Sequence, residues 1–187
     1  MKLKKLNAAL ALLSIIGILV HVSYQIFAYF TLYHNPKLTV ITAAPFMVCA
    51  CLHAVFGMAI VFTQADGTRL DIYKKRNMQT VLQRLSAALI LPLLILHINA
   101  FGILLKFSQI GKWPMFWLVI FLQIVFFGAV VTHVALSVTK AFITLGILTD
   151  IKKVKILDRV FYVLGAVIFI AAAFSVVRGE VIIFLPK

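Results

Sequence analysis

Four of the five histidines lie deep inside long apolar stretches of the sequence, one in each of four stretches: His21, His53, His97 and His133. Ionisable side chains inside a membrane are costly and are usually retained for function. One such histidine is easily explained as a core residue that is hydrogen-bonded to a neighbouring carbonyl. Four, each on a different predicted helix, indicate a ligand-binding set instead.

The depths of these histidines limit what they can bind. At a rise of 1.5 Å per residue, His97 lies roughly 13 Å and His133 roughly 28 Å from the outer edge, with His21 and His53 between them. A zinc site needs its ligands at one depth, so one shared ion is excluded. Two b-type haems, each held by two histidines from different helices of a four-helix bundle, fit these depths. His97 and His133 cannot share a haem, and either of the other two can pair with each.

The elements that position the histidines are predicted from composition. The chain has 187 residues, of which 64% are hydrophobic and 12% charged, and its mean hydropathy is +1.11. Soluble domains carry roughly 25% charged residues, and about 20 apolar residues span a bilayer as a helix. We therefore predict an all-α membrane protein with one domain over 1–187, a four-helix haem-binding bundle plus a fifth helix. The expected helices cover about 6–32, 41–62, 82–105, 114–148 and 160–177.

A weak internal repeat organises these helices. His53 and His133 each precede a basic loop, and His21 matches His97, so we expect two hairpins with one histidine per helix. Pro92 is expected to kink the third helix. All five acidic residues, Glu180 included, are placed in loops or at helix ends, which disfavours proton relays and cation-coupled transport.

The charge balance indicates topology. The chain carries 18 Lys and Arg against 5 Asp and Glu, a net charge of +13. The basic residues form short clusters between apolar runs, so they indicate membrane orientation and lipid contact, not nucleic acid. Thirteen of them lie at the N-terminus and around the loops Gln64–Val81 and Thr149–Arg159. The positive-inside rule then predicts a multi-pass protein of the cytoplasmic membrane, with the N-terminus in the cytoplasm and the C-terminus outside.

Residues near the same cytoplasmic level are candidates for contacts with the cofactor. Lys140 lies seven residues after His133, on the same helix face, and is a candidate partner for a haem propionate; an interfacial lysine explains it as well. Arg84 and Ser86 are expected to open the third helix at that level, Arg84 as a candidate contact of a propionate or a quinone and Ser86 as a candidate contact of a quinone. Gly17 and Gly57 each lie four residues from a histidine, where they admit either a flat macrocycle or close helix packing.

The assembly of these features resembles the five-helix, dihaem cytochrome b membrane anchor of succinate dehydrogenases and fumarate reductases. The resemblance is carried by Leu52-His53-Ala-Val-Phe-Gly57, Arg69-Leu-Asp-Ile-Tyr73, Gln83-Arg84-Leu-Ser86, Leu93–His97 and the run from His133 to Gly146. Ala87 and Ser137-Val-Thr-Lys140 depart from the pattern of the family. The resemblance implies that His21 and His97 hold the distal haem, and that His53 and His133 hold the proximal one.

The resemblance also implies partners: a flavoprotein and an iron–sulfur subunit, with a membrane quinone (menaquinone or ubiquinone) as substrate. The basic cytoplasmic residues would dock the soluble subunits, although positive-inside topology alone accounts for them: Arg69, Lys74, Lys75, Arg76, Lys152, Lys153 and Lys155. Two alternatives remain open from the sequence. One is a stand-alone dihaem cytochrome linked to quinone, and the other is a haem-free transporter or scaffold.

Overall fold

The computed structural model describes residues 2–63 and 74–185, without the side chains of 74–76. In these ranges the chain forms five helices and no strand, and every helix is long and apolar enough to cross a membrane. The predicted all-α, five-helix membrane fold is therefore confirmed. The helices are α1 (Lys2–Thr31), α2 (Pro36–Thr63), α3 (Lys74–Gln109), α4 (Trp113–Leu145) and α5 (Ile151–Phe184).

Several predicted helix ends were wrong, mostly because helices continue beyond their most apolar parts. α3 already begins at Lys74 and α5 at Ile151, so much of the two predicted basic loops is helical. Lysine and arginine are good helix formers, and a carboxylate oxygen of Asp150 caps α5 by accepting from the Lys152 amide at 2.7 Å. α4 ends at Leu145, earlier than expected, because Gly146 takes the left-handed conformation (φ 81°) that closes a helix.

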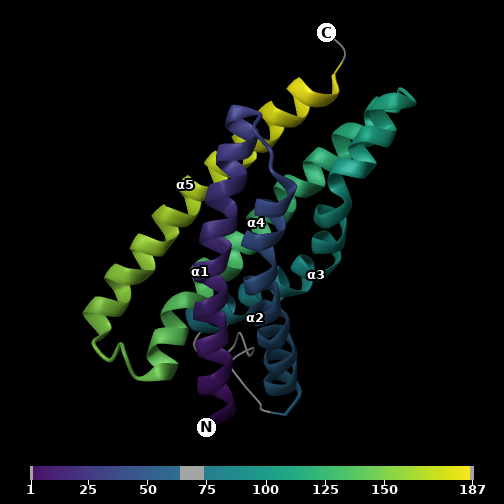
Figure 1. The fold of residues 1–187 in the computed structure, drawn as a ribbon. Coiled ribbons are helices and arrows are strands. Elements are labelled where there is room, and N and C mark those ends of the chain that lie inside the picture. Colours follow the sequence, from purple (N-terminus) through teal and green to yellow (C-terminus); the bar gives the residue numbers. More distant parts are fainter. Residues whose placement is uncertain (1, 64–73, 186–187) are drawn as a thin grey trace.

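The helices are arranged as two hairpins and a closing helix (Figure 1). α1 packs against α2, and α3 packs against α4. α5 is part of the core, since it packs against both α4 and α1, and α4 carries more buried residues than any other helix. Among the described helices α2 packs against α1 alone, and none of its residues is buried. The structure therefore places α2 at the edge and α5 in the core of the bundle.

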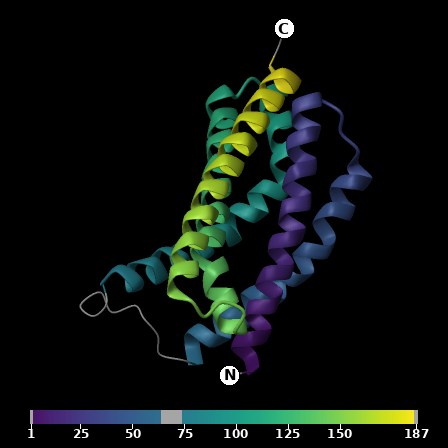
Figure 2. The ribbon, with the colours of Figure 1, turned by 90° about the vertical axis from the view of Figure 1, so that its left-hand side faces the viewer.

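α3 changes direction along its length, and its first part runs crosswise to the other helices (Figure 2). Pro92 lies inside this helix. A proline in a helix interior removes one backbone hydrogen bond and kinks the helix. The bend brings the first part of α3 beside the end of α4. There the α3 side chains of Thr80 and Gln83 accept hydrogen bonds from Lys140 of α4.

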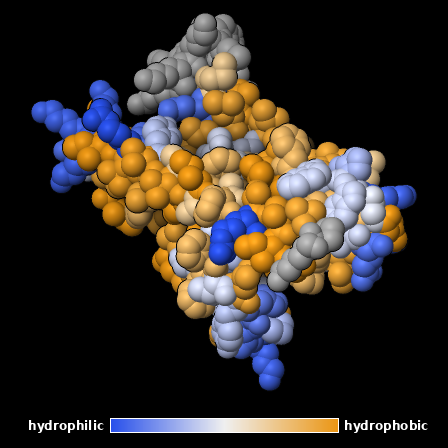
Figure 3. Space-filling view, turned by 90° about the horizontal axis from the view of Figure 1, so that it is seen from above, coloured by the Kyte–Doolittle hydropathy of each residue, from blue (hydrophilic) through white to orange (hydrophobic). Residues whose placement is uncertain are grey.

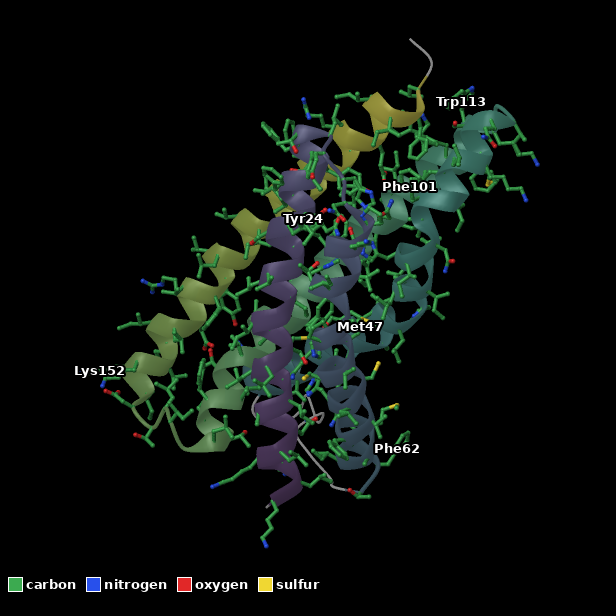
Figure 4. The ribbon with its side chains drawn as sticks, in the orientation of Figure 1. Tyr24, Met47, Phe62, Phe101, Trp113 and Lys152 are labelled. Atoms are coloured by element: carbon green, nitrogen blue, oxygen red, sulfur yellow. The ribbon has the colours of Figure 1, made fainter. Side chains whose placement is uncertain are left out.

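The outer surface is that of a membrane protein. Large apolar side chains are exposed along all five helices, and apolar surface also covers much of the end seen in Figure 3. The two chain ends lie at opposite ends of the bundle. Trp113 marks the end near the C-terminus, and Lys152 and Phe62 lie toward the other end (Figure 4). Five long helices with apolar outer surfaces are consistent with a multi-pass membrane protein.

Gly17 allows α1 and α2 to pack closely in their hairpin. A Cβ atom added there would overlap the side chain of Phe46 on α2, so the structure uses this glycine for close helix packing. A Cβ added at Gly57 would meet only the Asn7 amide nitrogen, at 4.0 Å. Of the two roles open to these glycines in the sequence, Gly17 therefore has the packing role.

We expect Gly17→Ala to lower the free energy of unfolding by about 1–3 kcal/mol, because the new methyl group forces Phe46 out of place. The matched control is Gly102→Ala in α3, where an added Cβ meets nothing within 4 Å. That change should be neutral or stabilise by up to about 1 kcal/mol, since alanine is the better helix former. Thermal unfolding in detergent compares the two variants, and equal midpoints would contradict this packing.

Candidate functional site

His53 on α2 and His133 on α4 meet across the two hairpins. Their ring centroids are 6.2 Å apart and the ring planes are inclined by 63°. Both side chains are half-buried. Within the described residues the backbones of α2 and α4 do not pack against each other, so the two helices approach through these side chains.

Each of these two rings is held by a backbone carbonyl of its own hairpin. His53 Nδ1 lies 3.2 Å from the Asn7 carbonyl oxygen on α1, and His133 Nδ1 lies 3.1 Å from the Gln83 carbonyl oxygen on α3. A carbonyl only accepts, so both Nδ1 atoms carry the hydrogen. In each hairpin the accepting residue lies 14 positions before the first histidine (7 and 21; 83 and 97). The weak repeat in the sequence therefore corresponds to a repeated hydrogen bond.

These hydrogen bonds leave the Nε2 atoms as the acceptors of both rings. Among the described residues, neither Nε2 atom has a hydrogen-bond partner. Histidines that ligate metals usually donate their other ring nitrogen to a carbonyl or carboxylate. With a metal–nitrogen bond of about 2 Å and a ring nitrogen roughly 1 Å from its centroid, two imidazoles on opposite sides of one iron have centroids about 6 Å apart. The spacing of His53 and His133 fits a bis-histidine haem.

His21 on α1 and His97 on α3 form a second group toward the other end. His21 Nδ1 lies 3.2 Å from Thr42 Oγ1, and the ring lies beside Phe46 with a centroid distance of 5.4 Å. Thr42 donates its own hydrogen to the Leu38 carbonyl at 2.8 Å, so it accepts from His21. His21 and His97 lie within electrostatic range of each other.

The His97 ring stacks on Phe126 of α4, with centroids 4.8 Å apart and planes 24° apart. Its Nδ1 atom is fully buried and has no hydrogen-bond partner. No three histidine, cysteine, aspartate or glutamate side chains gather as a metal site in the part of the chain that the structure describes. The described residues thus contain one close histidine pair, His53 and His133, and a further histidine on the other helix of each hairpin, His21 and His97.

Gln83 connects His133 with Lys140. The carbonyl of Gln83 accepts from His133 and from Ser86 Oγ, the latter at 2.9 Å, while its side-chain oxygen accepts from Lys140 Nζ at 2.7 Å. Lys140 also donates to Thr80 Oγ1 at 3.4 Å. Hydrogen bonds therefore join five residues at this level: Thr80, Gln83, Ser86, His133 and Lys140. Sequence reasoning placed Lys140 and Ser86 at this level but missed the role of Gln83, whose position 14 residues before His97 was the available signal.

Two of the predicted residues have a different setting from the one expected. Ser86 does not open α3, which begins at Lys74; it is buried and its hydroxyl is bonded within its own helix. Arg84 is half-buried in α3 and makes contacts of its own. His34 is exposed, as expected, and its Nε2 lies 3.1 Å from Thr39 Oγ1. Arg69 and the Arg69–Tyr73 motif lie outside the described residues.

Glu180 corrects the prediction that all carboxylates lie outside the spans. α5 continues to Phe184, so Glu180 belongs to a spanning helix, and its side chain is only 1% exposed. Its Oε1 accepts from Gln123 Nε2 at 2.7 Å, and Gln123 is 2% exposed. Hydropathy alone had ended the fifth helix before Arg178, whose guanidinium in fact donates to the Phe30 carbonyl at 2.7 Å and lies over the Phe30 ring.

No family model, curated protein or solved structure matches this chain. The fold makes it an all-α membrane protein with several spans. Its distinguishing feature is a set of four half-buried histidines, one on each helix of the two hairpins, of which His53 and His133 have ring centroids 6.2 Å apart.

Proposed function

We propose that this chain is the membrane-anchoring dihaem cytochrome b subunit of a succinate:quinone oxidoreductase, a succinate dehydrogenase or fumarate reductase. In this role it transfers electrons between an iron–sulfur subunit and a membrane quinone. One observation carries the proposal: the ring centroids of His53 and His133 lie 6.2 Å apart, and both Nδ1 atoms are held by backbone carbonyls. The spacing and the hydrogen bonds are those that two axial ligands of one iron require.

Each histidine pair is assigned one haem b. His53 and His133 are the ligands of the inner, proximal haem, and His21 and His97 are those of the outer, distal haem. When bound, a haem held by two histidines would supply one-electron redox chemistry. The chain itself holds the rings: the carbonyls of Asn7 and Gln83 and the hydroxyl of Thr42 keep the hydrogen on Nδ1 and leave Nε2 free.

Partners are assigned to the end of the bundle where α5 begins. Lys152, Lys153 and Lys155 are exposed there, and they would face the acidic surface of an iron–sulfur subunit that accompanies a flavoprotein. Anionic lipid headgroups are the other contact that such residues make. Lys140 and Arg84 are assigned to haem propionates or to the quinone, menaquinone or ubiquinone, and Ser86 to the quinone.

The first experiment is a reduced-minus-oxidised spectrum of the purified chain, followed by a haemochromogen assay. Two haems b per chain support the proposal, and one haem or none would overturn it. Mild purification through a C-terminal tag then tests the partners. A flavoprotein and an iron–sulfur protein in the eluate support the complex, whereas a dihaem chain that purifies alone is a stand-alone quinone-linked cytochrome.

A haem-free transporter or scaffold is the second candidate, and one observation favours it. Glu180 and Gln123 form a buried polar pair between α4 and α5, and buried carboxylates in membranes often mark transport pathways. In this alternative the histidines are structural, and their Nδ1 bonds hold the hairpins together. The absorption spectrum separates the two candidates, because only the cytochrome has a Soret band.

The orientation is tested with reporter fusions. We expect a reporter after Lys187 to be active outside the cytoplasm and a reporter inserted at Lys75 to be active inside it, because the more basic loops remain in the cytoplasm. Alkaline phosphatase and green fluorescent protein report the two sides. The opposite pattern would put the basic end, and any docked iron–sulfur subunit, on the wrong side of the membrane.

A further inference from the structure

Three of the four paired histidines have a hydrogen-bond acceptor for Nδ1, and His97 has none. His53, His133 and His21 are held by Asn7 O, Gln83 O and Thr42 Oγ1 at 3.1–3.2 Å. His97 Nδ1 is fully buried and has no partner. An unpaired buried N–H is costly, about 1–3 kcal/mol. A suitable acceptor close to His97 would remove this penalty.

The repeat between the hairpins indicates where that acceptor belongs. In the first hairpin the histidine of α1 is held by Thr42 on α2, which lies 11 residues before His53. In the second hairpin, Gln123 on α4 lies 10 residues before His133, close to the matching position. Gln123 also lies three residues before Phe126, on which the His97 ring stacks, and residues three apart share a helix face.

A hydrogen bond to Glu180 on α5 sets the orientation of the Gln123 side-chain amide. Its Nε2 donates to Glu180 Oε1 at 2.7 Å, and both side chains are buried. With the amide nitrogen directed to Glu180, the amide oxygen is left as a pure acceptor. Because Gln123 shares a face of α4 with Phe126, on which the His97 ring stacks, a rotation of the His97 or Gln123 side chain would complete the bond.

We propose that Gln123, oriented by Glu180, is the positioning residue that accepts the Nδ1 hydrogen of His97 and thereby directs its Nε2 to the outer haem. This inference rests on the proposed function, since it assigns the outer haem to His97. It gives all four axial histidines the same arrangement, with Nδ1 bonded to the chain and Nε2 free. Glu180 acts through Gln123 and does not touch the haem.

The test uses the full-length chain in its complex and measures the midpoint potential and the low-spin EPR signal of each haem. A hydrogen-bond acceptor on Nδ1 makes a histidine a more basic ligand, which favours the oxidised haem. We expect Gln123→Leu to raise the potential of the outer haem, with about a tenfold change in its ratio of reduced to oxidised form at a fixed potential. The inner haem, in the same sample, should not shift.

Two changes at Glu180 separate orientation from charge. Glu180→Gln removes the charge but keeps an oxygen that accepts from Gln123, so the potential of the outer haem should shift less than in Glu180→Leu. Glu180→Leu removes that oxygen, so the potential should move in the same direction as in Gln123→Leu. Thr139→Val is the matched control on α4: Thr139 is buried and its Oγ1 has no hydrogen-bond partner, so neither haem should shift.

The outcomes are distinct. If the wild-type chain holds two haems but Gln123→Leu and Glu180→Leu leave the outer potential and its EPR signal unchanged, the inference is overturned and the proposed function stands. If the wild-type chain holds no haem, both fail. If Gln123→Leu does not assemble, the contrast between Glu180→Leu and Glu180→Gln decides: a larger shift in the leucine variant supports the inference, and equal shifts overturn it.

Discussion

The wild-type chain is expected to contain two haems b, and His133→Ala only one. The ring centroids of His133 and His53 lie 6.2 Å apart, and the proposed function assigns His21 and His97 to the other haem. Loss of either inner ligand therefore removes the inner haem and leaves the outer ligands in place. The haemochromogen assay should fall from about two haems per chain to about one, and the remaining signal identifies the outer haem.

The reciprocal variants complete this prediction. His53→Ala should match His133→Ala, and His97→Ala or His21→Ala should remove the other haem. His34→Ala is the control, because this histidine is exposed and bonded only to Thr39 among the described residues; it should keep both haems. If single changes at His53 and at His97 removed the same haem, the pairing assigned here would be wrong. Loss of both haems in every variant would instead mean that the bundle folds only around them.

The spans were predictable from the sequence because hydropathy averaged over about 20 residues is large wherever a helix crosses lipid. The helix ends were not, since the first residues of α3 and α5 are basic and lie outside the apolar windows while still forming helix. Glu180 was misplaced for the same reason. A carboxylate next to Arg178 lowers the local hydropathy, and only the packing of α5 on α4 shows that Gln123 meets it.

The histidines of the candidate site were predictable from the sequence, but the groups that accept their hydrogen bonds were less so. Histidines stand out in an apolar sequence, and the depths estimated from helix rise already separated His97 from His133. The acceptors of His53 and His133 are backbone carbonyls, which every residue possesses, so the residue types at Asn7 and Gln83 carried no signal. A signal was present in their spacing, because Asn7 precedes His21 by the same number of residues as Gln83 precedes His97. That spacing becomes meaningful only once the two hydrogen bonds are seen.

We expect Lys140→Met to lower the potential of the inner haem by on the order of 100 mV. Lys140 lies within electrostatic range of His133 and is held by Gln83 and Thr80. Removing a cation favours the more positive, oxidised haem. Hydrogen bonds to charged groups are worth about 1.5–3 kcal/mol, and about 59 mV corresponds to a tenfold change for one electron. The outer haem, on the other histidine pair, should shift much less.

Matched variants separate charge from packing and from quinone binding. Lys140→Arg keeps the charge and should keep the potential, and Lys155→Met removes an exposed lysine of α5 and should change neither haem. His133 retains its bond to the Gln83 backbone in every one of these variants, because the acceptor is a carbonyl oxygen. A lowered inner potential with normal quinone affinity in Lys140→Met or Arg84→Met therefore assigns that residue to a propionate. An unchanged potential with weaker quinone reduction assigns it to the quinone site, and no change in either quantity would make both residues ordinary interfacial cations.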